Sequence, residues 1–352
     1  NKFKDAKFNK IFGDGFSSAL ATIIDHFMKK EDNLTNKKVT SSIDLSKMIQ
    51  LLSYVIDRDV FLSHHVNYMF IRISTRSTIS MKNERDFIEK VQSFVHNDAN
   101  FKNAFDLLEQ CKNEEFESLD RMKISFYLVR HILAPTNRKF PFVPLPKDYK
   151  ALIDKSEANL QKRWKGRIYE WLHYLTTLTV RITRNKRYVL VNMSLGQFVV
   201  FSALFKHQNL TLNDLHEITN IDESYLDIIL KSFKKKKFVT ADQKDPEKVI
   251  YNLDEKFEPK MIVNLCDNWS PTLAPQVKNL EGQRKKSVQA VIVQIMKKFK
   301  MLQTQNLVDL VTQKVSTLFA VTEEEIASAI RELVADEYLE ESEGGAQLSY
   351  IE

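Results

Sequence analysis

The clearest hydrophobic pattern in the chain runs from Arg284 to Lys300, where apolar residues recur at the spacing of one helix face. The apolar positions are Val288, Val291, Ile292, Ile295, Met296 and Phe299. At about 100° per residue this stripe spans roughly 140°, and Lys297 falls almost opposite its centre. An amphipathic helix over this segment would bury the stripe and hold the Lys297 amine in water.

Similar stripes near the start of the chain predict a series of helices over residues 1–131. One consists of Phe12, Phe16, Leu20, Ile23, Ile24 and Phe27, and a second of Leu45, Met48, Ile49, Leu52, Val55 and Ile56. The polar stretch Glu31–Ser42 separates them and is predicted to be a loop. Several long amphipathic helices with short connections favour an antiparallel helical bundle.

The pattern changes after Ile132, where closely spaced prolines interrupt the helical periodicity. The predicted elements are a helix at Lys147–Lys162 and strands at Arg167–Leu175 and Lys186–Asn192. Both strand segments are rich in aromatic and β-branched residues. Residues 132–266 are therefore interpreted as an α/β sheet domain.

Residues 194–240, within this domain, follow the element order of a winged-helix unit. The predicted helices are Leu195–Phe205, Leu212–Ile218 and Asp222–Phe233, followed by strands at Phe238-Val239, Val249–Leu253 and Lys260–Leu265. Residues 267–283 contain two prolines and no periodicity, which indicates a linker.

Residues 284–352 repeat the winged-helix order in a shorter form. Thr322 and Glu325 form a predicted capping box at the start of the third helix. Gly344-Gly345 supplies a turn between strands at Tyr338-Leu339 and Leu348–Ile351. The predicted fold class is mainly α with α/β: an antiparallel helical bundle, an α/β sheet domain and two winged-helix domains.

Composition is ordinary for a globular protein, with 43% hydrophobic and 28% charged residues among 352. No apolar run approaches the ~20 residues of a membrane span, and no signal-peptide pattern is present, so we expect an intracellular protein. The first residue, Asn1, suggests a fragment of something longer. Cys111 and Cys266 lie far apart and are interpreted as reduced thiols.

The net charge of +6 favours an anionic partner, which on charge alone could be nucleic acid, an acidic protein tail or a membrane surface. No phosphate-binding glycine motif, nucleophile elbow, HExxH motif or Cys/His ligand set occurs, so we expect no enzyme, cofactor or metal site. His64 and His65 point about 100° apart on a helix, which favours structural or surface roles over metal binding.

The segment Val288–Lys300 resembles the modification-site helix of the cullins, which reads roughly IQAAIVRIMK followed by a basic tail. In that family the lysine after Ile-Met accepts a ubiquitin-like modifier in neddylation. The resemblance therefore implies that Lys297 is the acceptor of an isopeptide bond. Gln294 stands where the family usually has Arg, and Glu352 where most members end in a small residue. Both differences bear on the efficiency of modification.

Further segments extend the resemblance over most of the chain. The matching phrases are Tyr54–Phe61 (YVIDRDVF), Gly166-Arg167 with Trp171-Leu172, Leu195–Leu204, the block from Glu325-Ile326 to Glu337–Glu340, and the closing Ser349–Ile351. The resemblance implies a non-catalytic scaffold of a RING-type ubiquitin ligase, whose adaptor and substrate receptor bind a part of the protein that is absent here.

In the cullins, a RING-box protein adds a strand to the α/β sheet, and zinc is expected on that partner alone. The implied contact residues are Ile168, Trp171, Leu172, Tyr188 and Leu190. A self-sufficient α/β core remains the alternative for this segment.

The family also has a basic canyon that attracts the acidic tail of a ubiquitin-conjugating enzyme. The implied residues here are Lys29, Lys30, Lys37 and Lys38, and a solvated run of charge explains them equally well. The resemblance further implies the modifier and its co-ligase as partners, and a location in cytoplasm and nucleus.

Two alternatives stay open. A winged-helix nucleic-acid-binding protein could use the basic cluster Lys234–Lys237, but the last predicted recognition helix, Thr322–Asp336, carries a net charge of −4 from five acids and one arginine. The cullin-like subunit of the anaphase-promoting complex need not keep an acceptor lysine. The Ile-Met-Lys pattern therefore argues against that subunit.

Overall fold

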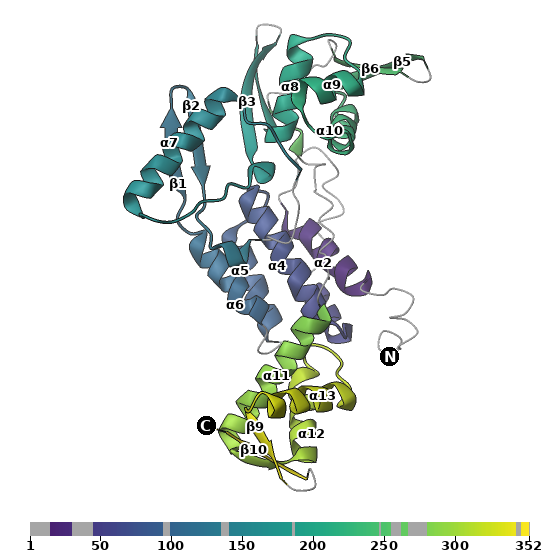
Figure 1. Cartoon of the computed structure of the whole chain (residues 1–352). Helices are drawn as coiled ribbons and strands as arrows, with labels where there is room; N and C mark the ends of the chain where they lie inside the picture. The colour runs from purple at the N-terminus through teal and green to yellow at the C-terminus, as the bar shows by residue number, and fades with distance from the viewer. Residues whose placement is uncertain are drawn as a thin grey trace. The chain divides into compact units, whose positions relative to one another are not determined.

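The computed structural model describes residues 15–29, 45–93, 99–134, 141–184, 187–245, 248–254, 262–266, 280–342 and 346–351 (Figure 1). The chain divides into two compact units. One contains Asn1–Phe70, Thr78–Glu109 and Pro275–Glu352, and the other Ile71–Ser77 and Gln110–Ala274. The described residues are mostly helical with small sheets, in agreement with the predicted mainly α class. None of the helices described is both long and apolar enough to cross a bilayer.

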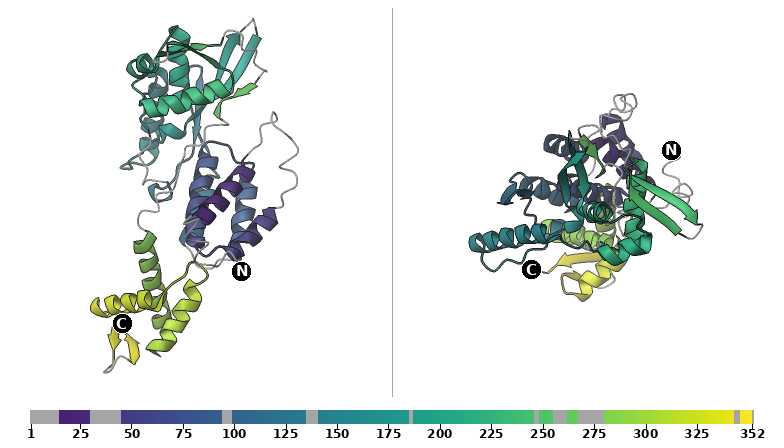
Figure 2. Two further views of the ribbon diagram at one scale, coloured as in Figure 1. Left: turned by 90° about the vertical axis from the view of Figure 1, so that its right-hand side faces the viewer. Right: turned by 90° about the horizontal axis from the view of Figure 1, so that it is seen from above.

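Helices from the N-terminal part of the chain lie side by side in the first unit (Figures 1 and 2). They are α2 (Gly15–Met28), α3 (Leu45–Leu51), α4 (Arg58–Ser74), α5 (Met81–Gln92) and α6 (Ala99–Gln110), with a short 3-10 helix at Leu52–Tyr54. Their shared core includes Leu20, Ile24, Leu52, Phe61, Phe87 and Leu107, each at most 3% exposed. Ile23, predicted to lie in the buried stripe, is 47% exposed because the buried face of α2 passes through Ser17, Ala21 and Asp25 instead.

His64 and His65 are both buried within this helical core. The His65 ring stacks on Phe61 at a centroid distance of 5.9 Å and lies 4.6 Å from the ring of Phe87. The structural role predicted for the pair is therefore confirmed, since the rings pack as core side chains.

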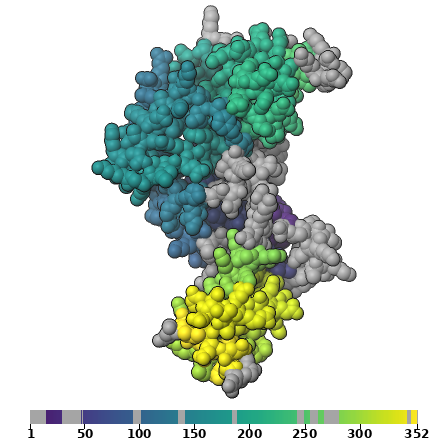
Figure 3. All heavy atoms as spheres, viewed as in Figure 1, coloured from purple at the N-terminus to yellow at the C-terminus, as the bar shows by residue number. Residues whose placement is uncertain are grey.

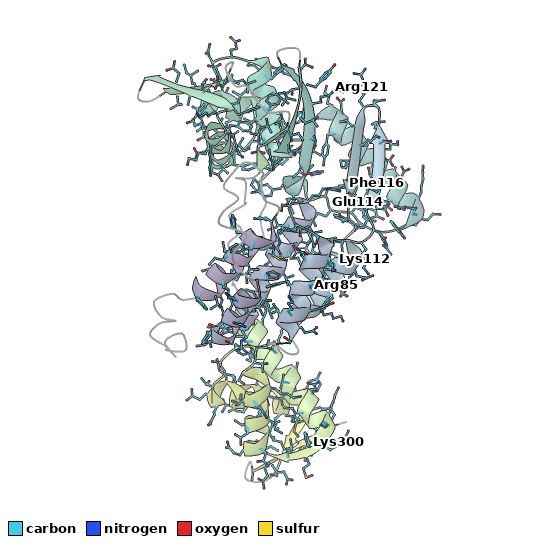
Figure 4. The ribbon with its side chains drawn as sticks, turned by 180° about the vertical axis from the view of Figure 1, so that it is seen from behind. Arg85, Lys112, Glu114, Phe116, Arg121 and Lys300 are labelled. Atoms are coloured by element: carbon cyan, nitrogen blue, oxygen red, sulfur yellow. The ribbon has the colours of Figure 1, made fainter. Side chains whose placement is uncertain are left out.

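A β-hairpin interrupts the segment that was predicted to be helical. Strands β1 (Glu115–Leu119) and β2 (Met122–Phe126) pair antiparallel, and Asp120 in their turn adopts a positive φ of 51°. Two ion pairs attach β1 to α7 (Lys147–Arg163), from Glu115 to Arg163 at 2.6 Å and from Glu117 to Lys155 at 3.0 Å. Figure 4 shows Arg121 and Glu114 at opposite ends of this hairpin. The helical prediction is wrong for these residues.

The second unit, which contains this hairpin, also contains a three-stranded sheet. Its order is β3 (Thr177–Arg184), β4 (Arg187–Ser194) and β7 (Ile262–Asn264), with β3–β4 antiparallel and β4–β7 parallel. Val189, Val191 and Met193 point into the core from β4, which confirms the strand predicted there. Strand β7 confirms a further predicted strand but joins this sheet rather than the hairpin that follows α10.

The strand predicted at Arg167–Leu175 is wrong. Residues 167–172 form no strand, and His173–Leu175 is a short 3-10 helix. Trp171 in this segment makes tertiary contacts instead. Its Nε1 donates to Glu157 Oε1 at 2.6 Å, and its ring packs edge-on against Phe126 at a centroid distance of 4.9 Å. The abundance of aromatic residues here therefore reflects packing against α7 and β2 rather than a pleated strand.

Three helices and a hairpin follow β4 in the order predicted. They are α8 (Leu195–Lys206), α9 (Leu212–Thr219), α10 (Glu223–Lys235), β5 (Val239–Asp245) and β6 (Lys248–Leu253). Ser194 with Gln197 and Thr211 with Asp214 form reciprocal capping boxes at the starts of α8 and α9. Gly196 in α8 lies against the Tyr225 side chain, so that a Cβ at Gly196 would lie 2.7 Å from the Tyr225 hydroxyl.

The C-terminal residues pack around one long helix and gather in a single body, coloured green to yellow in Figure 3. The elements are α11 (Leu280–Phe299), β8 (Met301–Gln303), α12 (Thr304–Val315), α13 (Glu323–Ala335), β9 (Leu339–Glu341) and β10 (Gln347–Tyr350). The sheet order is β8–β10–β9. The Thr322–Glu325 capping box is confirmed, whereas β8 was not predicted. Helix α11 starts inside the predicted linker, most of which, like the Gly344-Gly345 turn, lies outside the described residues.

Arg284 connects α11 to the start of α4 within the first unit. Its guanidinium donates to Asp59 Oδ2 at 2.8 Å and to Asp57 Oδ1 at 2.7 Å. Burial alone would lower the pKa of Arg284, but the two carboxylates outweigh it and raise that pKa. Arg58, between the two aspartates, donates from its backbone to Leu318 O at 2.8 Å and from its side chain to Thr317 O at 2.9 Å.

Gly196→Ala should destabilise the packing of α8 on α10, because the added methyl group collides with the Tyr225 side chain. Overpacking of this kind costs about 1–3 kcal/mol, which exceeds the roughly 1 kcal/mol that alanine gains over glycine in a helix. Hydrogen exchange of the α8 amides should therefore accelerate. The double variant with Tyr225→Phe should recover part of the loss, and unchanged exchange in Gly196→Ala would contradict the packing argument.

Arg284→Ala should loosen the attachment of α11 to residues 57–59 by about 1–3 kcal/mol, the usual cost of losing hydrogen bonds to charged groups. Arg284→Lys should recover little of it, because an ammonium group cannot bind two carboxylates in the same fork. Faster hydrogen exchange at residues 57–59 and at the start of α11 would report the change. The matched control is Lys285→Ala, since Lys285 pairs with Glu332 at an exposed position.

Candidate functional site

Helix α11 buries the stripe predicted from the sequence and exposes Lys297. Val288, Ile292, Ile295 and Met296 are at most 3% exposed, while Lys297 lies on the exposed face. Phe299 departs from the prediction, because it ends the helix beyond the packed region and is 47% exposed. The helix therefore presents a primary amine to solvent from a rigid, well-packed element.

Three lysine amines near the end of α11 lie over two aromatic rings. The Nζ atoms of Lys297 and Lys300 lie 5.8 Å and 5.5 Å from the centroid of the Tyr350 ring. The Nζ atom of Lys298 lies 5.3 Å from the centroid of the Phe299 ring. Figure 4 shows Lys300 on the C-terminal domain. These contacts are cation–π interactions, which hold ammonium groups against an aromatic face.

Exposed apolar side chains belong to the same part of the domain as these amines. They are Phe299, Met301, Tyr338 and Ile351, between 40% and 54% exposed. Backbone hydrogen bonds bring their segments together: Tyr350 N donates to Lys300 O at 2.8 Å, and Ile351 N donates to Tyr338 O at 3.1 Å. An apolar surface beside exposed amines is suited to contact with another protein.

The first turn of α13 is acidic and exposed. It contains Glu323, Glu324 and Glu325, whose negative charges interact favourably with the positive end of the helix dipole. Further along the same helix, Glu332 accepts hydrogen bonds from Lys285 and Gln289. This helix therefore presents negative charge where a recognition helix would have to meet phosphates.

The structure places the predicted partner-strand residues in two groups. Tyr188 and Leu190 lie on one face of β4 and are 66% and 36% exposed. Ile168 is 98% exposed, and Trp171 and Leu172 are half-buried, all in the non-strand segment before β3. The Trp171 ring contacts Phe126 on β2, so it packs against the β1–β2 hairpin.

Two residues extend the exposed face of β4 and were not identified from the sequence. Ile262 on β7 pairs with Leu190 and is 51% exposed. On β3, Arg181 pairs with Leu190, and its guanidinium lies 4.9 Å from the centroid of the Tyr188 ring. The alternation of Leu178, Val180 and Ile182 with polar residues could have identified β3, and with it Arg181.

Strands β1, β2, β3 and β7 of this unit each pair with a single neighbour within the part of the chain that the structure describes, which leaves each with an unpaired edge. Strand β2 pairs only with β1 there, and β3 pairs only with β4. Unpaired backbone N–H and C=O groups on such edges can bind an added strand. The contact between Phe126, at the end of β2, and Trp171, before β3, connects the segments that carry the edges of β2 and β3.

Of the predicted basic residues, only Lys29 lies within the described residues. Its Nζ atom lies 2.7 Å from Asp25 Oδ2, and its backbone forms an isolated bridge with Thr78. This ion pair compensates part of the Lys29 charge. Lys30, Lys37 and Lys38 lie outside the described residues.

The two thiols are free, and neither is suited to nucleophilic chemistry. Burial raises the pKa of both Cys111 and Cys266 to about 12, so both stay protonated at neutral pH. In the described part of the chain, no cluster of three or more His, Cys, Asp or Glu side chains is arranged to hold a metal ion.

Comparison with known proteins identifies two domains. Residues 133–258 match the cullin alpha+beta domain, and residues 283–345 match the cullin protein neddylation domain. The second match contains Lys297 and most of the surrounding surface.

Similarity to cullins covers nearly the whole chain. Cullin-1 of Dictyostelium discoideum is 25% identical over 92% of this chain and 45% of its own length. Cullin-1 of Caenorhabditis elegans is 23% identical over 94% of this chain and 45% of its own length. The chain thus spans about half the length of these curated relatives.

Among solved structures, "A Dual E3 Mechanism for Rub1 Ligation to Cdc53: Dcn1(P)-Cdc53(WHB)" contains a chain that is 24% identical. The match covers 24% of this chain and 100% of that chain at a TM-score of 0.21, which is too low to support a structural argument. The two domain matches and the cullin relatives agree with each other along the sequence. The chain therefore belongs to the cullin family and contains its alpha+beta domain and its neddylation domain.

Proposed function

We propose that this chain is the C-terminal scaffold region of a cullin-RING ubiquitin ligase and that neddylation at Lys297 activates it. One observation carries the proposal: within the matched neddylation domain, Lys297 stands exposed on the face of α11 opposite its buried stripe. As a scaffold, the chain would bring a charged ubiquitin-conjugating enzyme near a substrate, which makes transfer effectively intramolecular.

In the proposed modification, Lys297 acts as the nucleophile. Its Nζ attacks the thioester carbonyl that joins the modifier to a conjugating enzyme, so that a C–N bond forms and the C–S bond breaks. An ammonium group has no lone pair with which to attack, so the amine must first lose a proton. A base in the conjugating enzyme must therefore take the proton, since this chain supplies only the amine.

The proposed RING-box partner would add a strand to the alpha+beta domain. The unpaired edges of β2 and β3 support this proposal, because each offers a row of backbone groups to a partner strand. A two-stranded hairpin such as β1–β2 is marginally stable by itself, so an added strand would stabilise it. Zinc would be held by the RING-box protein and not by this chain.

The helix–helix–helix–hairpin order in residues 195–253 and the similar order in residues 280–350 support two winged-helix units. Lys29 is proposed to contribute to a basic surface that attracts the conjugating enzyme's acidic tail, although its pairing with Asp25 weakens that contribution. We further propose a location in cytoplasm and nucleus.

A nucleic-acid-binding function finds less support. Helix α13 places three glutamates in its first turn, where contacts to the nucleic acid would be made. Phosphates would be repelled from that surface.

In a reconstituted neddylation reaction, Lys297→Arg should abolish attachment at this position and reduce total attachment to the small share that Lys298 and Lys300 accept, because a guanidinium stays protonated and cannot attack. Attachment is measured as a mass shift of the chain. The matched controls are Lys298→Arg and Lys300→Arg, which should be modified at close to the wild-type rate. Equal modification of Lys297→Arg would exclude this lysine as the acceptor.

Binding of a RING-box protein should slow hydrogen exchange at β2, at β3 or at both, because an added strand protects amides on an unpaired edge. The inner strand β4, which is already paired on both sides, should change much less and serves as the internal control. A RING-box protein lacking its N-terminal strand should produce no protection. Tight binding without protection at either edge would contradict strand addition.

A further inference from the structure

Tyr350 contacts the proposed acceptor lysine from a strand that is firmly held in the domain. Strand β10 is the central strand of its sheet, and Tyr350 pairs with Leu339 on β9. Leu339 and Leu348 are at most 1% exposed, so they fix β9 and β10 to the core. The hydrogen bond from Tyr350 N to Lys300 O at 2.8 Å also ties β10 to the end of α11.

The rings of Tyr350 and Phe299 divide three neighbouring lysines between them. Tyr350 attracts the amines of Lys297 and Lys300, at 5.8 Å and 5.5 Å from its ring centroid. Phe299 attracts the amine of Lys298, at 5.3 Å from its ring centroid. The two rings therefore direct lysines that are adjacent in sequence to different places.

A lysine side chain has four rotatable bonds, and an exposed one samples many rotamers. A cation–π contact at an exposed site favours the rotamers that bring the amine to the ring by about two- to fivefold. Of the lysines held by Tyr350, Lys297 is in regular α-helix, whereas Lys300 follows the helix with a left-handed backbone at φ 64°. Lys297 therefore differs from Lys300 in that its backbone is held in a regular helix while its amine contacts a ring on a fixed strand.

We propose that Tyr350 is a positioning residue that selects Lys297 as the acceptor, by holding its amine beside the end of β10 while Phe299 draws Lys298 aside. This inference rests on the proposed function, because it concerns which amine the modifier reaches. Tyr350 takes no part in proton transfer. It acts through the orientation of Lys297 before the conjugating enzyme removes the proton.

The test compares Tyr350→Ile, which keeps an apolar β-branched residue in the strand, with Tyr350→Phe, which keeps the ring. In a reconstituted neddylation reaction, Tyr350→Ile should lower kcat for Lys297 about two- to fivefold with little change in KM, the size of the lost contact. Mass spectrometry of the product should show a larger share of modifier on Lys298 and Lys300. Tyr350→Phe should keep the wild-type rate and distribution.

The companion variant is Phe299→Ile, which removes the other ring and should raise the share of modifier on Lys298 rather than on Lys300. Hydrogen exchange of β9 and β10 shows whether each variant keeps its sheet. A wild-type rate and site distribution in Tyr350→Ile would overturn the inference, as would equal losses in Tyr350→Ile and Tyr350→Phe. Failure of the wild-type chain to be modified at Lys297 would instead overturn the proposed function itself.

Discussion

The 100° rotation between successive helical residues determines where Lys297 points once its neighbours are buried. Ile292, Ile295 and Met296 pack α11 against α12, α13 and β10, so the helix cannot rotate without exposing them. The exposed amine is thus a consequence of core packing rather than of any feature of Lys297 itself. The aromatic rings near the end of the helix then restrict a side chain whose backbone is already fixed.

The start of α11 is held by charge rather than by apolar packing alone. Arg284 binds Asp57 and Asp59, and its guanidinium also lies 4.7 Å from the centroid of the Phe319 ring. Arg58 adds contacts to the backbone before α13. Residues 57–59 thus contact both the start of α11 and the segment between α12 and α13. Attachment through partly exposed ion pairs is weakened by salt more than attachment through apolar contacts is.

The sequence allowed α11, α7, β4 and the Thr322 capping box to be predicted, because each depends on local periodicity or on neighbours three residues apart. It did not allow the pair between Arg284 and Asp59 to be predicted, since these residues are 225 positions apart. The hairpin at β1–β2 was missed although Met122–Phe126 alternates, because the surrounding helical pattern dominated. The Tyr350 contact was likewise beyond reach, since it requires β10 to fold back to the end of α11.

Site mapping on the protein from its own cells tests the central claim most directly. The full-length protein would be isolated under denaturing conditions, digested and examined by mass spectrometry for a peptide that carries the C-terminal residues of a ubiquitin-like modifier. The account predicts a branched peptide with the modifier joined to Lys297 Nζ. An unbranched Lys297 peptide together with a branch at a lysine outside α11 would contradict it.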